Sequence, residues 1–254
     1  MYPTDYGSFS GSFAGRHKLL ARLKTGVNLR RLRPVMAELA EGASLLDVGC
    51  GDGALLLALR RKRPDLRLYG LDWHFTDATR EELERNGIAT IEGPLETVAL
   101  PDHRFTVVTM LQLIEHLWEP RDCLAKIAGA LQPRGRLLIE TPNADGYDRA
   151  IFRRGAWGGY YFPRHLNLYN KGSLARLVRQ AGFLPERQTS LVAPLVWCYS
   201  LQAAVQIAAG PDSFALRWIR AGNLPLLAVF AALDSLARAI GIQTSNQQLV
   251  ARLD

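Results

Sequence analysis

Short apolar runs alternate with helical stretches between residues 44 and 141. Five runs have the character of strands: Ser44–Val48, Leu66–Leu71, Ile88–Ile91, Phe105–Met110 and Arg136–Thr141. Helices are predicted between them and after them, at Ala54–Arg61, Ala78–Asn86, Pro120–Leu131 and Ser173–Gln180. The tail, Asn246–Leu253, alternates like a final strand. Strands that alternate with helices imply crossover connections, so we expect an α/β fold with a doubly wound, mostly parallel sheet of about seven strands.

The pattern changes after residue 190. Leu191–Ala209 contains 19 residues without a charge, and Leu224–Leu233 is a second apolar run. A membrane span needs about 20 apolar residues, and the first run approaches that length only by including Pro194 and three polar residues. We therefore expect amphipathic helices that cover a hydrophobic pocket or lie on a membrane surface. Ordinary buried helices remain the alternative.

These patterns suggest four parts of the chain. Residues 1–43 are expected to form an N-terminal helical cap. Residues 44–190 form the core, residues 191–243 a helical insertion, and residues 244–254 the last strand of the core.

The composition is that of a globular protein. Of the 254 residues, 48% are apolar and 22% are charged. The three cysteines, Cys50, Cys123 and Cys198, are far apart and form no CxxC pair, so neither a disulfide framework nor a thiolate zinc site is expected. The first residues are polar and lack the pattern of a secretory signal. A cytoplasmic location is therefore expected, with peripheral membrane contact left open.

The net charge of +7 is unevenly distributed. Residues 6–37 carry seven basic residues and no acid, and residues 148–187 carry eight basic residues and two acids. Two basic stretches on an otherwise acidic chain suggest a face that meets an anion, such as a lipid headgroup, a phosphorylated substrate or a nucleic acid. A solvated helix surface explains them equally well. Nucleic acid is not favoured, because the basic runs lack regularly interleaved aromatic residues.

The most informative motif is a glycine-rich turn between the first strand and the first helix. It reads Gly49-x-Gly51-x-Gly53, and these glycines allow positive φ and close approach of the backbone to a ligand. Asp72 ends the second strand, 23 residues after Gly49, where a carboxylate can accept both hydroxyls of a ribose. The two features together predict a ligand that contains a nucleoside.

The charge at the turn helps to choose the nucleoside. Gly49-x-Gly51-x-x-Ala54 also satisfies the dinucleotide fingerprint in its alanine form. Asp47, however, lies just before the first glycine, where it would repel a pyrophosphate and suit a cationic sulfonium or an amino group. This favours S-adenosyl-L-methionine. A nicotinamide-dependent reductase and a non-catalytic cofactor-binding module remain alternatives.

Several motifs resemble those of class I S-adenosylmethionine-dependent methyltransferases, in the branch that includes the ubiquinone-biosynthesis O-methyltransferases. The resemblance rests on Asp47–Gly53, Asp72, Leu113–Leu117 and Leu131–Ile139. It extends over residues 44–190, through Thr141–Asn143 and Pro163–Leu166. It implies the Rossmann-like methyltransferase fold, with residues 44–190 as its cofactor-binding core. It does not specify the methyl acceptor.

The resemblance also implies roles for individual residues. Asp72 would bind the ribose hydroxyls and Trp73 would lie along the adenine. The methionine and ribose parts would be lined by Gly49, Cys50 and Gly51, and the other side would be closed by Met110, Leu111 and Gln112. One departure from the family concerns the turn after the third strand. An acid usually follows the glycine there, but this chain has Pro94, so a backbone group or Glu96 must bind the adenine amine.

Two histidines are candidates for a catalytic base. His165 lies in a loop rich in aromatic residues and glycine, which is expected to fold over the acceptor. His116 follows Glu115 after the fourth strand, and a structural role of this pair in anchoring the next helix is the alternative. No group of His, Asp and Glu with metal-ligand spacing is visible in the sequence, so no metal is expected.

The expected reaction is in-line attack on an activated methyl group. The apolar insertion and the basic stretches suggest O-methylation of a hydrophobic or lipid-like acceptor delivered from an anionic membrane surface. A small soluble natural product or a sugar-linked acceptor is the alternative.

Overall fold

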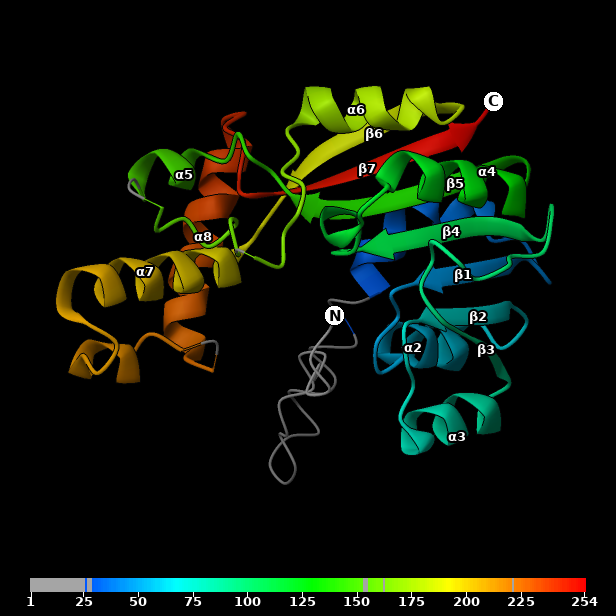
Figure 1. The fold of residues 1–254 in the computed structure, drawn as a ribbon, viewed down its shortest axis with the longest axis horizontal. Coiled ribbons are helices and arrows are strands. Elements are labelled where there is room, and N and C mark those ends of the chain that lie inside the picture. The colour runs from blue at the N-terminus through cyan, green and yellow to red at the C-terminus, as the bar shows by residue number, and fades with distance from the viewer. Residues whose placement is uncertain (1–25, 27–28, 153–154, 162, 221) are drawn as a thin grey trace. The chain divides into compact units, whose positions relative to one another are not determined.

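The computed structural model describes residues 26, 29–152, 155–161, 163–220 and 222–254. Seven strands form one sheet in the order β3-β2-β1-β4-β5-β7-β6. Their bounds are β1 Ser44–Val48, β2 Arg67–Asp72, β3 Ile88–Glu92, β4 Phe105–Leu111, β5 Leu131–Pro142, β6 Phe183–Leu191 and β7 Asn246–Leu253. β1 pairs in parallel with β2 and with β4, and β2 pairs in parallel with β3. β7 runs opposite to β5 (Figure 1). The predicted doubly wound α/β fold is confirmed.

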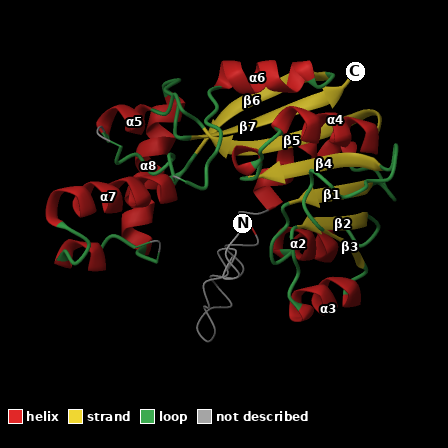
Figure 2. Cartoon of the chain, viewed as in Figure 1, coloured by secondary structure: helices red, strands yellow, loops and turns green. Residues whose placement is uncertain are grey.

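Helices connect these strands (Figure 2). The α-helices are α2 Ala54–Lys62, α3 Asp77–Arg85, α4 Pro120–Ala130, α5 Tyr147–Ile151, α6 Lys171–Gln180, α7 Pro194–Ala209 and α8 Leu224–Ala239. Three short 3-10 helices are η1 Arg33–Glu38, η2 Ile114–His116 and η3 Phe214–Arg217. The predicted helices and strands between residues 44 and 130 agree with these bounds to within one residue. Two elements, β6 and α5, had not been predicted.

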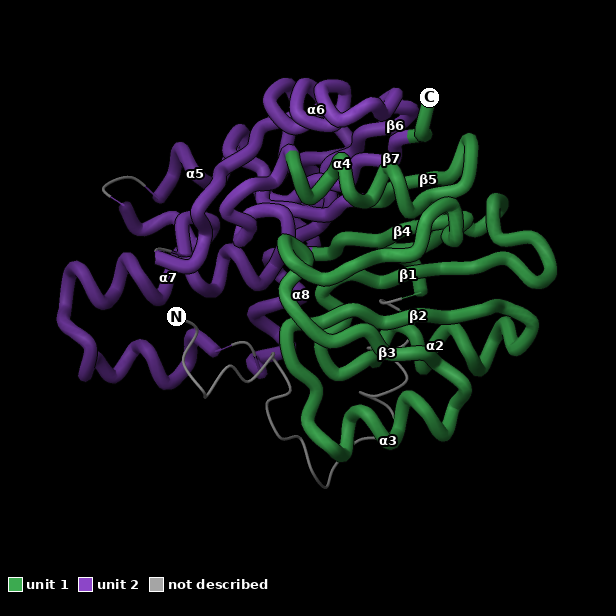
Figure 3. Tube along the Cα trace, turned by 45° about the vertical axis from the view of Figure 1, so that its right-hand side comes forward, with its two compact units in different colours: residues 1–111, 122–138, 252–254 green, residues 112–121, 139–251 purple. Residues whose placement is uncertain are grey.

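The chain divides into two compact units (Figure 3). Residues 1–111, 122–138 and 252–254 belong to the first, and residues 112–121 and 139–251 to the second. In the first unit β1 is buried at every position, as expected for a central parallel strand. α2 buries five consecutive residues, Leu55–Leu59, in the same core. The strands that carry the glycine turn and Asp72 are therefore held by apolar packing close to those residues.

In the second unit, α7 and α8 form a helical pair with a core of their own. The rings of Trp197 on α7 and Phe230 on α8 stack with their centroids 5.2 Å apart. Asp234 on α8 is buried and accepts hydrogen bonds from the Trp197 indole Nε1 at 2.9 Å, the Ala193 backbone N–H at 2.7 Å and the Tyr147 hydroxyl at 3.2 Å. Three donors compensate for the loss of water around this carboxylate, so α8 is fixed against α7 at this point.

No helix among the described residues is long and apolar enough to cross a membrane. The two apolar runs expected after residue 190 correspond to α7 and α8, which lie between β6 and β7 in the chain. Most of the expected N-terminal cap, residues 1–43, lies outside the described residues. The proposed division of the chain into cap, core and insertion stays a prediction.

Candidate active site

The glycine turn has the backbone conformation that its sequence predicts. Gly49, Gly51 and Gly53 have φ values of 75°, 57° and 68°, in the left-handed region that suits glycine. A Cβ atom on Gly53 would also lie 2.4 Å from the Leu83 side chain. Glycine is therefore required at the start of α2 both for conformation and for space.

Three carboxylates surround this turn in the first unit. Asp47 is buried and accepts a hydrogen bond from the Thr109 hydroxyl at 2.6 Å. Asp52 accepts one from the Ala54 N–H at the start of α2, at 3.1 Å. Asp72 accepts one from the Gly51 N–H, at 2.7 Å.

This distribution of charge is unfavourable for a pyrophosphate. An anion at a helix N-terminus needs free N–H groups, but Asp52 already occupies the Ala54 N–H. The N–H groups of Gly49 and Cys50 donate to the Leu71 carbonyl, at 2.7 and 3.1 Å. Three nearby acids instead suit a ligand that carries a sulfonium and an ammonium group. The residues present therefore fit S-adenosylmethionine.

The Asp72 carboxylate is half-buried beside the glycine turn. Burial raises the pKa of Asp72, and hydrogen bonds from the backbone N–H groups of Gly51, Trp73 and His74 act in the opposite direction. The bond from Gly51 engages Oδ2, which directs that side of the carboxylate to the turn. Trp73 follows directly and is 54% exposed, so part of its indole is accessible to a ligand.

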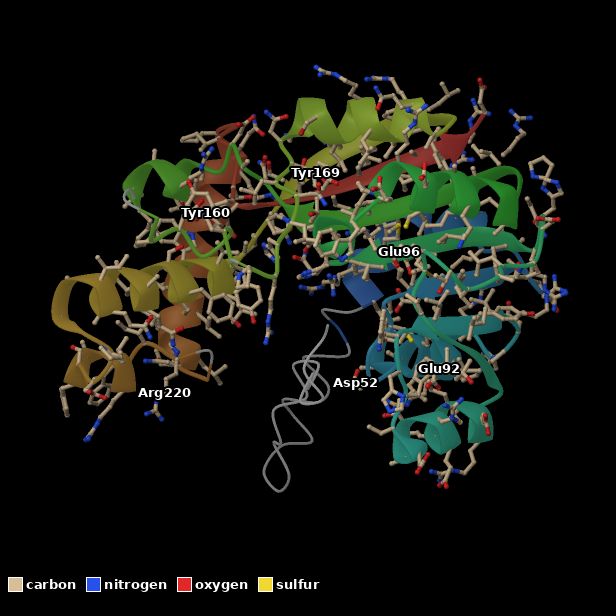
Figure 4. The ribbon with its side chains drawn as sticks, in the orientation of Figure 1. Asp52, Glu92, Glu96, Tyr160, Tyr169 and Arg220 are labelled. Carbon is tan, nitrogen blue, oxygen red and sulfur yellow. The ribbon has the colours of Figure 1, made fainter. Side chains whose placement is uncertain are left out.

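The loop after β3 differs from the family in side chains but is firmly held. Glu92 ends β3 and is bound by His74 Nδ1 at 2.8 Å and by Arg80, and these two partners lower the pKa of Glu92. Beyond Gly93, the Lys126 ammonium donates to the carbonyls of Leu95, Glu96 and Val98, at 2.8, 2.7 and 3.1 Å. Figure 4 labels Glu92, at the end of β3, and Glu96, in the loop that follows. The Glu96 side chain is exposed, so Glu96 and the backbone of this loop both remain candidates for the contact to the adenine amine.

Cys50 contributes shape and no reactive thiol. Burial, together with the charges of Asp47 and Asp72, raises the pKa of the Cys50 thiol far above its ordinary value. A Cβ on Gly70 would lie 2.8 Å from its sulfur, so Gly70 leaves the space that this side chain fills. A neutral, enclosed thiol is a poor nucleophile.

The three residues assigned to the end of β4 differ in accessibility. Met110 is fully buried and shows no surface to a ligand. Leu111 is half-buried, and Gln112 is exposed. Gln112 has a positive φ of 59°, and its N–H donates to the Glu140 carbonyl at 2.8 Å. Its side-chain amide also donates to Asn246, at 3.1 Å. Leu111 and Gln112 are therefore better placed than Met110 for a cofactor contact.

The two candidate histidines come together in the second unit. The rings of His116 and His165 meet edge to face with their centroids 4.8 Å apart. His116 Nδ1 lies 2.8 Å from the Arg164 carbonyl oxygen, and His165 Nδ1 lies 2.8 Å from that of Gly159. A carbonyl only accepts, so each Nδ1 carries the proton and each Nε2 keeps its lone pair.

Glu115 ties the loop of His165 to η2. Its backbone carbonyl accepts hydrogen bonds from the N–H groups of Leu166 and Asn167, at 2.8 and 3.1 Å. Its buried carboxylate accepts one from the Thr141 hydroxyl at 2.8 Å. The Asn167 side chain also donates to the Leu117 carbonyl, at 2.7 Å. Sequence reasoning missed Thr141 and Asn167, because their role depends on contacts between segments 26 to 50 residues apart.

The surroundings of both rings favour the neutral imidazole, which is the form that can accept a proton. Burial lowers the pKa of His116 and that of His165, and for His165 the neighbouring His116 lowers the pKa further. Both are therefore neutral at pH 7. Such an Nε2 atom can act as a general base if an acceptor proton comes within hydrogen-bond reach.

The same residues could also hold a metal ion. Ligand atoms of Glu115, His116 and His165 all lie within 4.8 Å of one another, and a carboxylate with two neutral imidazoles is a common donor set for divalent transition metals. This group was not recognised in the sequence, since 49 residues separate the two histidines. The expectation that no metal is needed stays a prediction.

Two further features belong to this part of the second unit. Tyr169 is buried, and its hydroxyl has no hydrogen-bond partner among the described residues. Burial together with the charge of Glu115 raises the pKa of Tyr169. A cavity of about 450 Å³ lies beside α5. It is lined by Ala144, Asp145, Gly146, Tyr147, Arg149, Ala150, Phe152, Gly155 and Tyr160. Tyr160 follows the glycine that holds His165, so the cavity wall and the histidine share one loop.

Comparisons with known proteins show the family to which the chain belongs. Residues 17–187 match the family model described as "Methyltransferase domain". The chain is 30% identical over 150 residues to a probable S-adenosylmethionine-dependent methyltransferase of Mycolicibacterium smegmatis, covering 58% of this chain and 54% of that protein. It is 30% identical over 173 residues to a ubiquinone biosynthesis O-methyltransferase of Cereibacter sphaeroides, covering 64% and 69%. A putative sarcosine dimethylglycine methyltransferase of Galdieria sulphuraria has the same fold, with a TM-score of 0.62, 16% identity, and coverage of 94% of this chain and 92% of that one.

The fold and the carboxylate-lined glycine turn define a class I cofactor-binding methyltransferase architecture. The chain belongs to the S-adenosylmethionine-dependent methyltransferase family. It spans little more than half the length of the Mycolicibacterium relative.

Proposed function

We propose that this enzyme transfers the methyl group of S-adenosylmethionine to a hydroxyl oxygen of a hydrophobic or lipid-like acceptor, with His165 as the general base. The observation that carries the proposal is the histidine pair. Each Nδ1 is 2.8 Å from a backbone carbonyl, which leaves each Nε2 free. Burial lowers the pKa of each ring, so each is neutral at pH 7.

In this proposal the cofactor is held by Asp47, Gly49, Cys50, Gly51, Asp72, Trp73, Leu111 and Gln112. S-adenosylmethionine supplies an activated methyl group on a sulfonium, which departs as a neutral thioether. Asp72 accepts the ribose hydroxyls, and Asp47 offsets the positive charge near the turn. These residues mainly contribute alignment, which can supply ~7–11 kcal/mol of the barrier reduction.

His165 Nε2 accepts the proton of the acceptor hydroxyl as the oxygen attacks. The Gly159 carbonyl keeps the Nδ1 proton in place, so the ring is oriented for this transfer. His116 is a positioning residue that packs against His165 and keeps its pKa low. A general base in this position increases the rate of methyl transfer about 10²–10⁴-fold.

Three observations support an apolar acceptor. The Cereibacter relative is named for ubiquinone biosynthesis. The cavity beside α5 has aromatic walls from Tyr147, Phe152 and Tyr160, which suits a ring or an apolar chain. The helices α7 and α8 expose large apolar side chains. An acceptor of this kind resides in a bilayer, so the proposal includes peripheral contact with an anionic membrane.

The first test is calorimetric titration of the purified protein with S-adenosylhomocysteine, with NADH and NADPH as controls. Micromolar binding of S-adenosylhomocysteine alone is the expected result. Methyl transfer from labelled cofactor is then measured on phenols with a prenyl or alkyl tail and on the same phenols without the tail. The tailed acceptors are expected to have the higher kcat/KM.

The proposal is contradicted if turnover prefers soluble untailed acceptors, or if the methyl group is found on nitrogen. Chelation provides a separate test of the histidine pair. Activity that survives EDTA supports His165 as a base. Activity that is lost with EDTA and restored by a divalent cation instead assigns Glu115, His116 and His165 to a metal.

A further inference from the structure

One end of the helical pair formed by α7 and α8 is covered by large apolar side chains. We call Ile207, Phe214, Trp218 and Leu224 the apolar tip; they come from the last turn of α7, from η3 and its following residue, and from the start of α8. Phe214 and Trp218 are 66% and 65% exposed. Several large apolar side chains gathered at one exposed site mark a surface with a function in binding.

The outer side of α8 continues this apolar surface. Val229, Leu233, Leu236 and Ile240 follow the helical repeat along one side and are all exposed; we call them the α8 stripe. A neighbouring side of α8 carries the buried residues Phe230, Asp234 and Ala237. The core of the helical pair is thus complete without the α8 stripe, which remains unpartnered within the described residues.

Charges around the apolar tip favour an anionic partner. Arg217 lies over the Phe214 ring, with its guanidinium carbon 5.3 Å from the ring centroid. Arg220 follows in the same loop and is labelled at the end of the helical pair in Figure 4. The described residues between 194 and 242 include two acids. Asp212 is exposed, and Asp234 is buried. Arg217 and Arg220 are exposed at the apolar tip, and together with Asp212 they give the tip a net positive charge.

We propose that the apolar tip and the α8 stripe form the face by which this enzyme docks on an anionic lipid bilayer. A tryptophan and a phenylalanine beside two arginines have the composition of a membrane-interface anchor. An amphipathic helix that lies in the interface buries one apolar side, as the α8 stripe would. No described helix is long enough to cross the bilayer, so the contact is peripheral.

A second copy of the chain is a less suitable occupant of this face. A two-fold contact would bring the arginines of one tip close to those of the other, and like charges oppose such pairing. An anionic bilayer instead complements the charge of the tip. This inference deepens the proposed function by naming the surface that reaches a lipid-like acceptor. Binding to vesicles, however, does not require the cofactor or turnover.

The test is flotation of the full-length protein with vesicles of phosphatidylglycerol and phosphatidylcholine, at low and at high salt. The wild type is expected to float with the anionic vesicles at low salt and to bind pure phosphatidylcholine more weakly. Arg217→Glu/Arg220→Glu should lower the partition coefficient at least about 30-fold at low salt, since each arginine near the surface contributes about fivefold. Phe214→Glu/Trp218→Glu should lower it at least about tenfold at either salt concentration.

Matched controls separate this surface from general effects of charge and of exposed aromatics. Arg61→Glu/Lys62→Glu makes the same change of charge at the end of α2, where both side chains are exposed. Trp118→Glu removes an aromatic side chain that is 74% exposed outside the helical pair. Both controls should bind vesicles within about threefold of the wild type. The substituted side chains are exposed, so thermal unfolding should stay close to that of the wild type.

Three results would overturn the inference. The first is that the wild type ignores anionic vesicles at low salt. The second is that Phe214→Glu/Trp218→Glu floats like the wild type. The third is that sedimentation shows self-association which this double variant abolishes, because the face would then belong to a second copy. Calorimetry with S-adenosylhomocysteine on the same samples keeps the two proposals distinct. Vesicle binding without cofactor binding would refute the proposed function and leave the docking face intact.

Discussion

The glycine turn of the first unit and the histidine pair of the second are assembled over very different distances along the chain. Gly49, Gly51 and Asp72 lie within 23 residues of one another, at the ends of two adjacent parallel strands. His116 and His165 are 49 residues apart and are brought together by the backbone carbonyls of Arg164, Gly159 and Glu115. One region is a local motif to which we assign the cofactor, and the other is a tertiary arrangement of side chains from distant segments.

The difference suggests how specificity is divided in this enzyme. The cofactor region is made of backbone conformation and carboxylates, so a change there should weaken binding of S-adenosylhomocysteine. The histidine region is made of side chains on a loop, so a change there should slow methyl transfer and spare cofactor binding. Variants in one region should leave the property of the other unchanged.

The largest effect is expected for His165→Gln. Glutamine fills similar space but cannot accept the proton, so kcat should fall about 10²–10⁴-fold. Affinity for S-adenosylhomocysteine should stay within about twofold, which would keep the two regions distinct. Radiolabelled methyl transfer and calorimetry measure the two quantities. His103→Gln is the control, because His103 also bonds a carbonyl through Nδ1, that of Leu131 at 3.1 Å, and is exposed in the first unit. An unchanged kcat in His165→Gln would remove this residue from the mechanism.

A smaller effect is expected for Asp72→Ala. Loss of hydrogen bonds from ribose hydroxyls to a carboxylate should weaken S-adenosylhomocysteine binding about 10- to 100-fold. Asp72→Asn keeps the shape and one acceptor, so its loss should be intermediate. Glu81→Ala removes an exposed acid on α3 and serves as the control. If Asp72→Ala binds with the affinity of the wild type, the carboxylate does not hold the ribose and the assignment of the cofactor region is wrong.

The smallest effect concerns the pH dependence of the His116→Gln variant. When protonated at acid pH, His116 lowers the pKa of His165, so a side chain that never takes up this charge should raise that pKa. The base is active only when deprotonated, hence kcat/KM falls as pH drops through the pKa of His165. The acid limb of the pH–rate profile should therefore move to higher pH in His116→Gln. A limb that stays in place would indicate that the two rings do not interact during turnover.

Much of the first unit could be predicted because its signals are local. β1, β2 and β4 are short, mainly apolar runs, and the turn between β1 and α2 requires glycine at Gly53 for conformation and for space. Asp72 was identifiable from its distance along the chain to the turn. Met110 was assigned to the cofactor by analogy, but its burial could not be read from the sequence of a mainly apolar strand.

The second unit was harder to predict. β6 is the edge strand of the sheet, and its sequence contains Pro185, Glu186 and Arg187. Proline and charges are tolerated at an edge, where one side of the strand needs no partner, so the usual alternation is lost. The grouping of Glu115, His116 and His165 depends on a loop whose path is set by tertiary hydrogen bonds. No spacing in the sequence reveals such a group.

Buried Asp234 fixes the rotational setting of α8. Any turn of this helix about its own axis would pull the carboxylate away from Trp197, Ala193 and Tyr147 and leave an unpaired charge in the core. The helix therefore cannot roll inward to hide Leu236 and Ile240. Its apolar side is a permanent feature of the enzyme, and attraction to lipid should be the same before and after the cofactor binds.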